Sequence, residues 1–169
     1  DEDDYLRAGQ EYSHLIRTSN WSGFLETNYR PEHPPLAKIL TGISLLTAPE
    51  KELTPDAPTT ASPNKDLPRT LVKPGRMVNA ILGTLTVLAL ALIDPVAGLL
   101  LATHTFTIKY VSQIMLEALP ALTSLMTVFA YVKSKKHNAN IKWLMVSAVF
   151  LGLTAASKYL YCLVAIAIL

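Results

Sequence analysis

The sequence predicts an all-α protein, a polytopic membrane helical bundle with an extracytoplasmic loop that carries interfacial amphipathic helices. Three observations support this class. Half of the 169 residues are hydrophobic and the mean hydropathy is +0.30, which is high for a soluble domain. Charged and proline-rich material is concentrated in residues 1–75, whereas residues 76–169 consist mainly of apolar runs. The apolar residues of the first part recur at helical spacing.

Composition also limits the class and the extent of the chain. The net charge of +2 is too small to indicate nucleic-acid binding, and the single cysteine, Cys162, excludes a disulfide framework and a thiolate zinc site. The chain starts without Met or an apolar leader, so no signal peptide is visible. It ends in an apolar run, Leu163–Leu169, that is too short to span a bilayer. We therefore expect a piece of a larger membrane protein, cut at both ends.

Two amphipathic helices are predicted in residues 1–75. Apolar side chains between Tyr5 and Arg17 recur every three to four positions, which is typical of a helix lying on a surface or in a membrane interface. A second helix is predicted from Glu32, because the tandem prolines that follow are tolerated in a first helical turn. Its apolar residues share one face: Leu36, Ile39, Leu40, Ile43 and Leu46.

Two connecting segments are predicted to be irregular. Residues 18–31 are rich in Asn, Ser, Gly and aromatic side chains, which favours a loop. They contain the triplet Asn20-Trp21-Ser22, a candidate glycan acceptor if this side is extracytoplasmic. Residues 49–74 hold six prolines among Thr, Ser, Asp and Lys, which predicts an irregular connector.

Apolar segments that are expected to cross the membrane follow this loop. Asp94-Pro95 predicts a tight turn between the first two, and His104, within the second, is expected to be hydrogen-bonded inside the bundle. The spans cover about residues 76–94, 96–111, 117–132, 142–156 and 159–169, the last of them incomplete.

The predicted topology brings three distant parts of the chain to one face. The densest basic cluster between spans lies in residues 133–142, so this loop is predicted to be cytoplasmic. Counting crossings from it puts residues 1–75, 112–117 and 157–159 together outside. These segments contribute the ionisable residues Asp1 and Glu2, Glu117, and Lys158.

Several roles suit these side chains. Asp1 or Glu2 could act as a general base towards a hydroxyl nucleophile, or form a solvated acidic terminus. Clustered carboxylates could instead hold a divalent cation, with His33 as a candidate nitrogen ligand. Lys158 carries a point charge that suits a phosphate, or it snorkels at the end of a span. Glu117 precedes a predicted helix, where negative charge also suits the helix dipole.

The order of these residues resembles the first extracytoplasmic loop of the GT-C class of membrane glycosyltransferases. The closest resemblance is to the polyprenyl-phosphate-mannose protein O-mannosyltransferases, and the lipid A aminoarabinose transferases and oligosaccharyltransferases resemble the chain more distantly. The resemblance covers nearly the whole chain but only the N-terminal part of such an enzyme. It depends on Asp1-Glu2-x-x-Tyr5, His33-Pro34-Pro35-Leu36 and Thr154-Ala155-Ala156-Ser157-Lys158-Tyr159, each followed or preceded by a helix.

The resemblance implies transfer of a sugar, mannose in the closest family, from a polyprenyl phosphate to a protein Ser or Thr hydroxyl. The transfer would take place on the outer face of the cell or endoplasmic reticulum membrane and invert the anomeric centre. Asp1 would be the general base, and Glu2 would orient the acceptor or, with His33, bind a divalent metal. The implied substrate-binding residues are Tyr5, His33, Glu117 and Lys158, of which Lys158 would hold the lipid phosphate.

One position departs from the family pattern, and other functions stay open. The second acidic position of the family is often an Asp shortly after an Arg, whereas Glu117 follows Lys109 and Gln113. One alternative is an enzyme of the same class with another lipid-linked sugar and a lipid or glycan acceptor. The others are a transporter fragment, in which the ionisable residues line a path, and a structural subunit whose acidic loop docks a partner. The clustering at one face and the lack of an inverted repeat favour the enzyme.

Overall fold

The computed structural model describes residues 2–27, 31–49, 69–136 and 140–168, and all regular structure in them is helical. The predicted all-α class is therefore confirmed. The helices are α1 (Glu2–Arg17), α2 (Trp21–Glu26), α3 (Leu36–Leu45), α4 (Arg69–Ile93), α5 (Pro95–Thr103), α6 (Thr105–Val111), α7 (Ala118–Lys136), α8 (Ile141–Ser157), the 3₁₀ helix η2 (Tyr159–Leu163) and α9 (Val164–Ile168).

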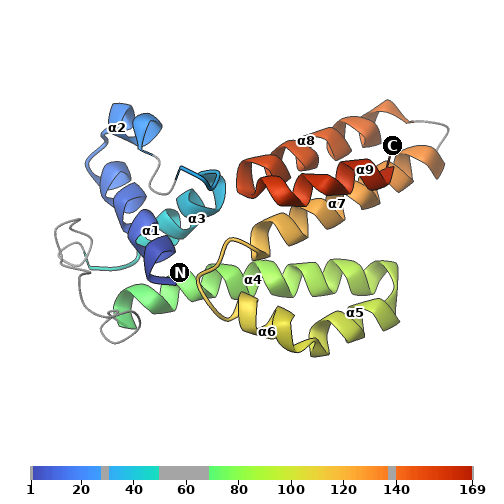
Figure 1. The fold of residues 1–169 in the computed structure, drawn as a ribbon, viewed down its shortest axis with the longest axis horizontal. Coiled ribbons are helices and arrows are strands. Elements are labelled where there is room, and N and C mark those ends of the chain that lie inside the picture. The colour runs from blue at the N-terminus through green and yellow to red at the C-terminus, as the bar shows by residue number, and fades with distance from the viewer. Residues whose placement is uncertain (1, 28–30, 50–68, 137–139, 169) are drawn as a thin grey trace.

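Helices α1, α2 and α3 gather at one end of the molecule, and the longer helices extend away from them (Figure 1). α4 turns back through α5 and α6, and α7 and α8 form a second antiparallel pair. The connection between α6 and α7 lies beside the beginning of α1 (Figure 1). This arrangement brings the N-terminal segment, the start of α7 and the end of α8 towards the same region.

The predicted helix in residues 5–17 is confirmed and begins earlier, at Glu2. Its crossing with α3 is close because glycine occurs on both sides. A Cβ atom at Gly42 would lie 2.7 Å from Tyr12 Cβ, and one at Gly9 would lie 2.7 Å from Thr41 Cγ2. The small residues let the two backbones approach.

The second predicted helix differs in its start and in its buried face. α3 begins at Leu36, after Pro35 as the N-cap residue, and not at Glu32. The buried α3 residues are mostly small or polar, whereas Ile43 of the predicted apolar face is 48% exposed. Close packing on α1 selects the small side chains, and Leu36 and Leu40 contact the region where α7 begins. The predicted apolar stripe is thus half-buried to exposed, and a different face of α3 packs on α1.

Within the predicted loop of residues 18–31, Trp21–Glu26 forms α2. Asn20 Oδ1 accepts a hydrogen bond from the Gly23 N–H at 2.9 Å and so caps the helix. The Phe24 ring packs edge-on against Tyr12 of α1, with 5.3 Å between ring centroids. A local cap and one tertiary aromatic contact thus fold a segment whose composition favours a loop.

Residues 96–111, which were predicted as one span, form two helices, because the chain breaks at His104. This residue has extended backbone angles, ends α5 and caps α6, and its Nδ1 lies 3.1 Å from Thr107 Oγ1. It is exposed, which also corrects the expectation that it lies inside the bundle. With 9 and 7 residues, α5 and α6 are each far shorter than the roughly 20 residues of a span. The tight turn is confirmed: Asp94 caps α5 through the N–H groups of Val96 and Ala97.

The other predicted spans match helices with shifted ends. α4 begins at Arg69, inside the predicted connector, and contains Pro74. α7 and α8 match residues 117–132 and 142–156 closely, whereas residues 159–168 form η2 and the short α9. The rest of the predicted connector, residues 50–68, lies outside the described residues.

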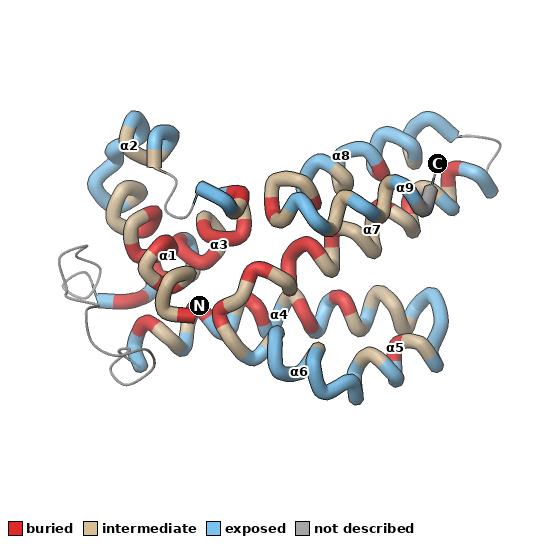
Figure 2. The backbone as a smooth tube through the Cα atoms, viewed as in Figure 1, coloured by how far each residue is buried: buried red, intermediate tan, exposed pale blue. Residues whose placement is uncertain are grey.

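Among the described helices, α4 is the one that is long and apolar enough to cross a membrane, with a mean hydropathy of 1.9 in its apolar window. Much of the long-helix surface is exposed (Figure 2), including large apolar side chains such as Leu85, Leu92 and Val149. The buried face of α4 is instead small or polar beyond its first turn: Gly75, Asn79, Gly83 and Thr86.

Candidate functional site

The site is organised around an ion pair that joins two distant parts of the chain. Lys158 Nζ lies 2.5 Å from Glu117 Oε1, and the two side chains are 23% and 28% exposed. Glu117 directly precedes α7. Lys158 separates α8 from η2 in an extended conformation, with its N–H donating to Thr154 O. Two residues that the predicted topology put on one face are therefore in direct contact.

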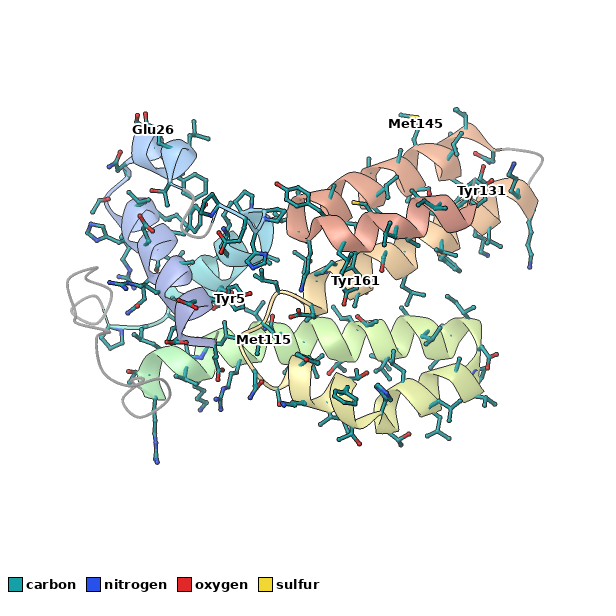
Figure 3. All side chains as sticks on the ribbon, in the orientation of Figure 1. Tyr5, Glu26, Met115, Tyr131, Met145 and Tyr161 are labelled. Atoms are coloured by element: carbon teal, nitrogen blue, oxygen red, sulfur yellow. The ribbon has the colours of Figure 1, made fainter. Side chains whose placement is uncertain are left out.

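A cavity of about 470 Å³ lies next to this pair. The ion pair forms part of its polar surface, and α4, α5, α6, α7 and η2 supply the rest of the wall. Figure 3 shows Tyr161 between the α7–α9 layer and α4. The larger side chains of the wall are mainly apolar or aromatic: Leu101, Phe106, Tyr110, Val111, Leu160 and Tyr161.

The Glu117 carboxylate is only half satisfied within the described part of the chain. Oε1 receives the Lys158 ammonium, whereas Oε2 is buried without a hydrogen-bond partner. An unsatisfied buried acceptor costs about 1–3 kcal/mol. Lys158 is thus the group that holds this carboxylate, and an anion that competes for Lys158 would weaken its hold.

The connection that leads to Glu117 is fixed by hydrogen bonds from two other helices. Asn79 of α4, which is 5% exposed, donates from Nδ2 to Gln113 O at 2.7 Å and to Met115 O at 2.9 Å. The Ile114 N–H donates to Glu2 Oε1 of α1 at 3.0 Å. Buried backbone groups are therefore paired, and the segment between α6 and α7 has a defined conformation.

Glu2 also forms a two-point ion pair with Arg76 in the N-terminal half of α4. Arg76 Nε and Nη2 donate to the two carboxylate oxygens at 2.7 and 2.8 Å, and Glu2 is 7% exposed. The Arg76 guanidinium lowers the pKa of the Glu2 carboxyl, against the effect of burial, and the Ile114 N–H assists. Both oxygens are engaged, so Glu2 anchors α1 to α4 and to the α6–α7 connection. Asp1, the predicted general base, lies outside the described residues.

Two further predicted site residues, Tyr5 and His33, contact each other. Their ring centroids are 5.9 Å apart in an edge-on arrangement. Tyr5 packs near Leu116 (Figure 3 shows it close to Met115), and the His33 carbonyl accepts a hydrogen bond from Lys38 Nζ at 2.8 Å. The pair lies near the α6–α7 connection, and neither residue is part of the described cavity wall.

Glu2 and His33, the predicted metal ligands, contact other residues and are not grouped with a third ligand among the described residues. In residues 2–27, 31–49, 69–136 and 140–168, no group of three or more His, Cys, Asp or Glu side chains could hold a metal ion. Glu2 is bound to Arg76, and His33 contacts Tyr5. Because Asp1 lies outside these residues, the metal site stays a prediction.

Sequence reasoning missed Arg76 and Asn79, which hold the site together. They lie three positions apart, where one face of a helix brings side chains together. Polar or charged residues within an apolar helix usually have a function or a bonding partner. Arg76 and Asn79 interrupt the apolar sequence of α4 and could have been recognised in this way. The aromatic wall residues Phe106 and Tyr110 gave no comparable signal, because their position depends on the break at His104.

Comparison of the chain with protein-family models, curated proteins and solved structures gave no match. The function is therefore inferred from the residues of the site and their geometry.

Proposed function

We propose that this chain is the N-terminal part of a multi-pass membrane glycosyltransferase. The enzyme transfers a sugar, mannose in the family it resembles, from a polyprenyl phosphate to a protein Ser or Thr hydroxyl on the extracytoplasmic face. The observation that carries the proposal is the Glu117–Lys158 pair beside a largely apolar cavity of about 470 Å³. Such a site suits an amphiphile with a charged head and an apolar chain.

The packing of α7 on α8 supports a membrane location for both helices. Thr154 Oγ1 donates to Thr123 Oγ1 at 2.8 Å, and Ser147 Oγ donates to Thr127 O at 2.9 Å, all within the helix contact. Large apolar side chains, such as Val149, face outward. A soluble protein would bury the large apolar side chains and expose the polar ones. Membrane helices instead associate through small and polar residues.

Lys158 is the proposed phosphate-binding residue. An ammonium group has three donors, of which Glu117 uses one, so phosphate oxygens can take the others. The positive charge stabilises the phosphate as its bond to the sugar breaks. The exposed apolar side chains of Phe106 and Leu160 line the same cavity and offer contacts to the first isoprene units.

Acceptor activation is assigned to Asp1 from the family resemblance. The acceptor oxygen forms a bond to the anomeric carbon, its proton moves to the Asp1 carboxylate, and the sugar–phosphate bond breaks on the opposite side. The contacts of Glu2, the neighbour of Asp1 in the sequence, support this assignment. Its bonds to Arg76 and Ile114 hold the beginning of α1 beside the connection that carries Glu117.

A transfer assay tests the proposal. The full-length protein in membranes is incubated with labelled polyprenyl-phosphate mannose and a Ser/Thr acceptor peptide. Label should reach the peptide with the wild type and with the control Asp4→Asn, but not with Asp1→Asn, which should still insert and fold. Retained transfer by Asp1→Asn would remove Asp1 from the mechanism. Absence of transfer from a panel of lipid-linked sugars, to protein, lipid or glycan acceptors, would favour the transporter or structural-subunit alternatives.

A further inference from the structure

The end of the α7–α8 pair farthest from the candidate site is strongly basic. The last turn of α7 and the first turn of α8 contribute Lys133, Lys135, Lys136 and Lys142, and no Asp or Glu follows Glu117 in the sequence. The neighbouring α4–α5 turn holds Asp94, which uses Oδ1 to cap α5. This end therefore presents an excess of positive charge.

Hydrogen bonds between the two helices fix the positions from which these lysines project. Ser134 Oγ donates to Asn140 O at 3.1 Å, and the Asn140 N–H donates to Ser134 O at 3.2 Å. Asn140 Oδ1 also caps α8 by accepting from the Lys142 N–H at 3.0 Å. The lysines thus extend from two defined helix ends.

An aromatic layer lies directly inside this basic end. Lys133 Nζ lies 5.5 Å from the centroid of the Phe129 ring, and Lys135 Nζ lies 5.3 Å from that of Tyr131. Phe129 in turn packs edge-on against Trp143, at 6.4 Å between centroids. Figure 3 shows Tyr131 and Met145 towards this end, where large apolar side chains are exposed. From the end of the helix pair inward, the side chains are first ammonium groups, then aromatic rings and then apolar groups. Membrane helices have this order of residues where they cross the membrane–water interface.

We propose that this end of the α7–α8 pair is a binding surface for anionic phospholipid headgroups. The lysines attract the phosphates, and the aromatic layer places them at headgroup depth. A solvated basic loop would carry the same charge, whereas the exposed apolar side chains next to the rings favour the headgroup region. The inference depends on the membrane placement of α7 and α8 and not on sugar transfer.

Fluorescence quenching tests this surface. Trp21→Phe leaves Trp143 as the one tryptophan of this chain. The protein is reconstituted in phosphatidylcholine vesicles that contain an equal fraction of either phosphatidylglycerol or phosphatidylcholine with brominated acyl chains. Brominated phosphatidylglycerol should occupy the surface beside Trp143 at least threefold more than brominated phosphatidylcholine, and salt should reduce this preference.

Paired variants locate the effect. Lys135→Gln/Lys136→Gln should reduce the preference towards equality. The control Lys73→Gln/Lys109→Gln removes the same charge from exposed positions elsewhere and should preserve it. Equal quenching by both lipids in the wild type would overturn the proposal, as would equal losses in the two double variants. Absence of quenching by either lipid would overturn the membrane placement on which it depends. Sugar transfer by Lys135→Gln/Lys136→Gln should match the wild type, so the two proposals fail separately.

Discussion

Lys158 and Glu117 are 41 positions apart, yet Lys158 Nζ lies 2.5 Å from Glu117 Oε1. The antiparallel α7–α8 pair produces this contact, because Glu117 precedes the first helix and Lys158 follows the second. The pair faces a cavity whose remaining wall is largely apolar. The packing of α7 on α8 therefore positions Lys158, the proposed phosphate-binding residue, at the cavity.

Lys158→Met should lower sugar transfer about 100-fold or more, because the leaving phosphate loses its positive partner. It should also lower the free energy of unfolding by about 1–3 kcal/mol, because the Glu117 carboxylate stays buried without a partner. Transfer assays and thermal unfolding in nanodiscs measure the two effects. Lys109→Met, at an exposed position of α6, is the matched control and should change neither. Normal transfer by Lys158→Met would remove this residue from the phosphate site.

The Glu2–Arg76 pair should make stability dependent on pH. The pKa of Glu2 is lowered from its ordinary 4.5 by hydrogen bonds from Arg76, so the unfolded chain binds a proton at a higher pH than the folded chain. The stabilisation is present above about pH 4.5 and is lost as the pH falls through the folded-state pKa.

Glu2→Gln should therefore destabilise the protein by about 1–3 kcal/mol at pH 7, and the difference from the wild type should shrink below pH 4.5. Unfolding midpoints between pH 7 and pH 3 measure this dependence. Glu26→Gln, at an exposed carboxylate of α2, should show a small difference at every pH. A Glu2→Gln effect that does not vary with pH would argue against the ion pair.

Asn79→Leu should loosen the connection between α6 and α7. The carbonyls of Gln113 and Met115 lose their donor, which costs about 1–3 kcal/mol for each group left unpaired. Hydrogen exchange of residues 112–117 should accelerate relative to that of α8. Thr84→Val is the control, because the Thr84 hydroxyl bonds to Ala80 of its own helix. Unchanged protection in Asn79→Leu would show that the connection is held by its apolar contacts.

Two glycine substitutions compare a close helix crossing with an open helix surface. Gly42→Ala puts a Cβ 2.7 Å from Tyr12 Cβ and 3.0 Å from Gly9 O, and should cost about 1–3 kcal/mol. A Cβ atom at Gly152 of α8 would have no neighbouring atom within 4 Å, so Gly152→Ala should raise the free energy of unfolding by about 0.5–1 kcal/mol. Thermal unfolding distinguishes the two signs. Equal effects would contradict the described α1–α3 crossing.

Local signals predicted much of the fold correctly. Helical periodicity located α1, and the Asp94-Pro95 dipeptide located the α4–α5 turn, because both depend on neighbouring residues only. The predicted helix order puts Glu117 and Lys158 at the same end of the α7–α8 pair, and the two residues are in contact. The predicted cytoplasmic side of residues 133–142 stays a prediction. The predicted roles of Asp1, Tyr5 and His33 stay predictions.

The failures of the sequence analysis have a common physical cause in tertiary packing. The apolar stripe of α3 gave no sign of the face that packs on α1, where close contact selects Thr41 and Gly42. The apolar run of residues 96–111 gave no sign that His104 would cap a new helix. The ion pair of Glu2 with Arg76 spans 74 positions, and no local pattern reveals it.

Photocrosslinking tests the central claim, that the cavity beside Glu117 and Lys158 receives the lipid-linked sugar. The probe is polyprenyl-phosphate mannose with a diazirine on its first isoprene unit, added to the full-length protein in membranes. Adducts should map to the cavity wall, at Phe106, Tyr110 or Leu160, and should be lost with Lys158→Met. Adducts confined to the outer face of α4, around Ile81 and Leu85, would contradict the account.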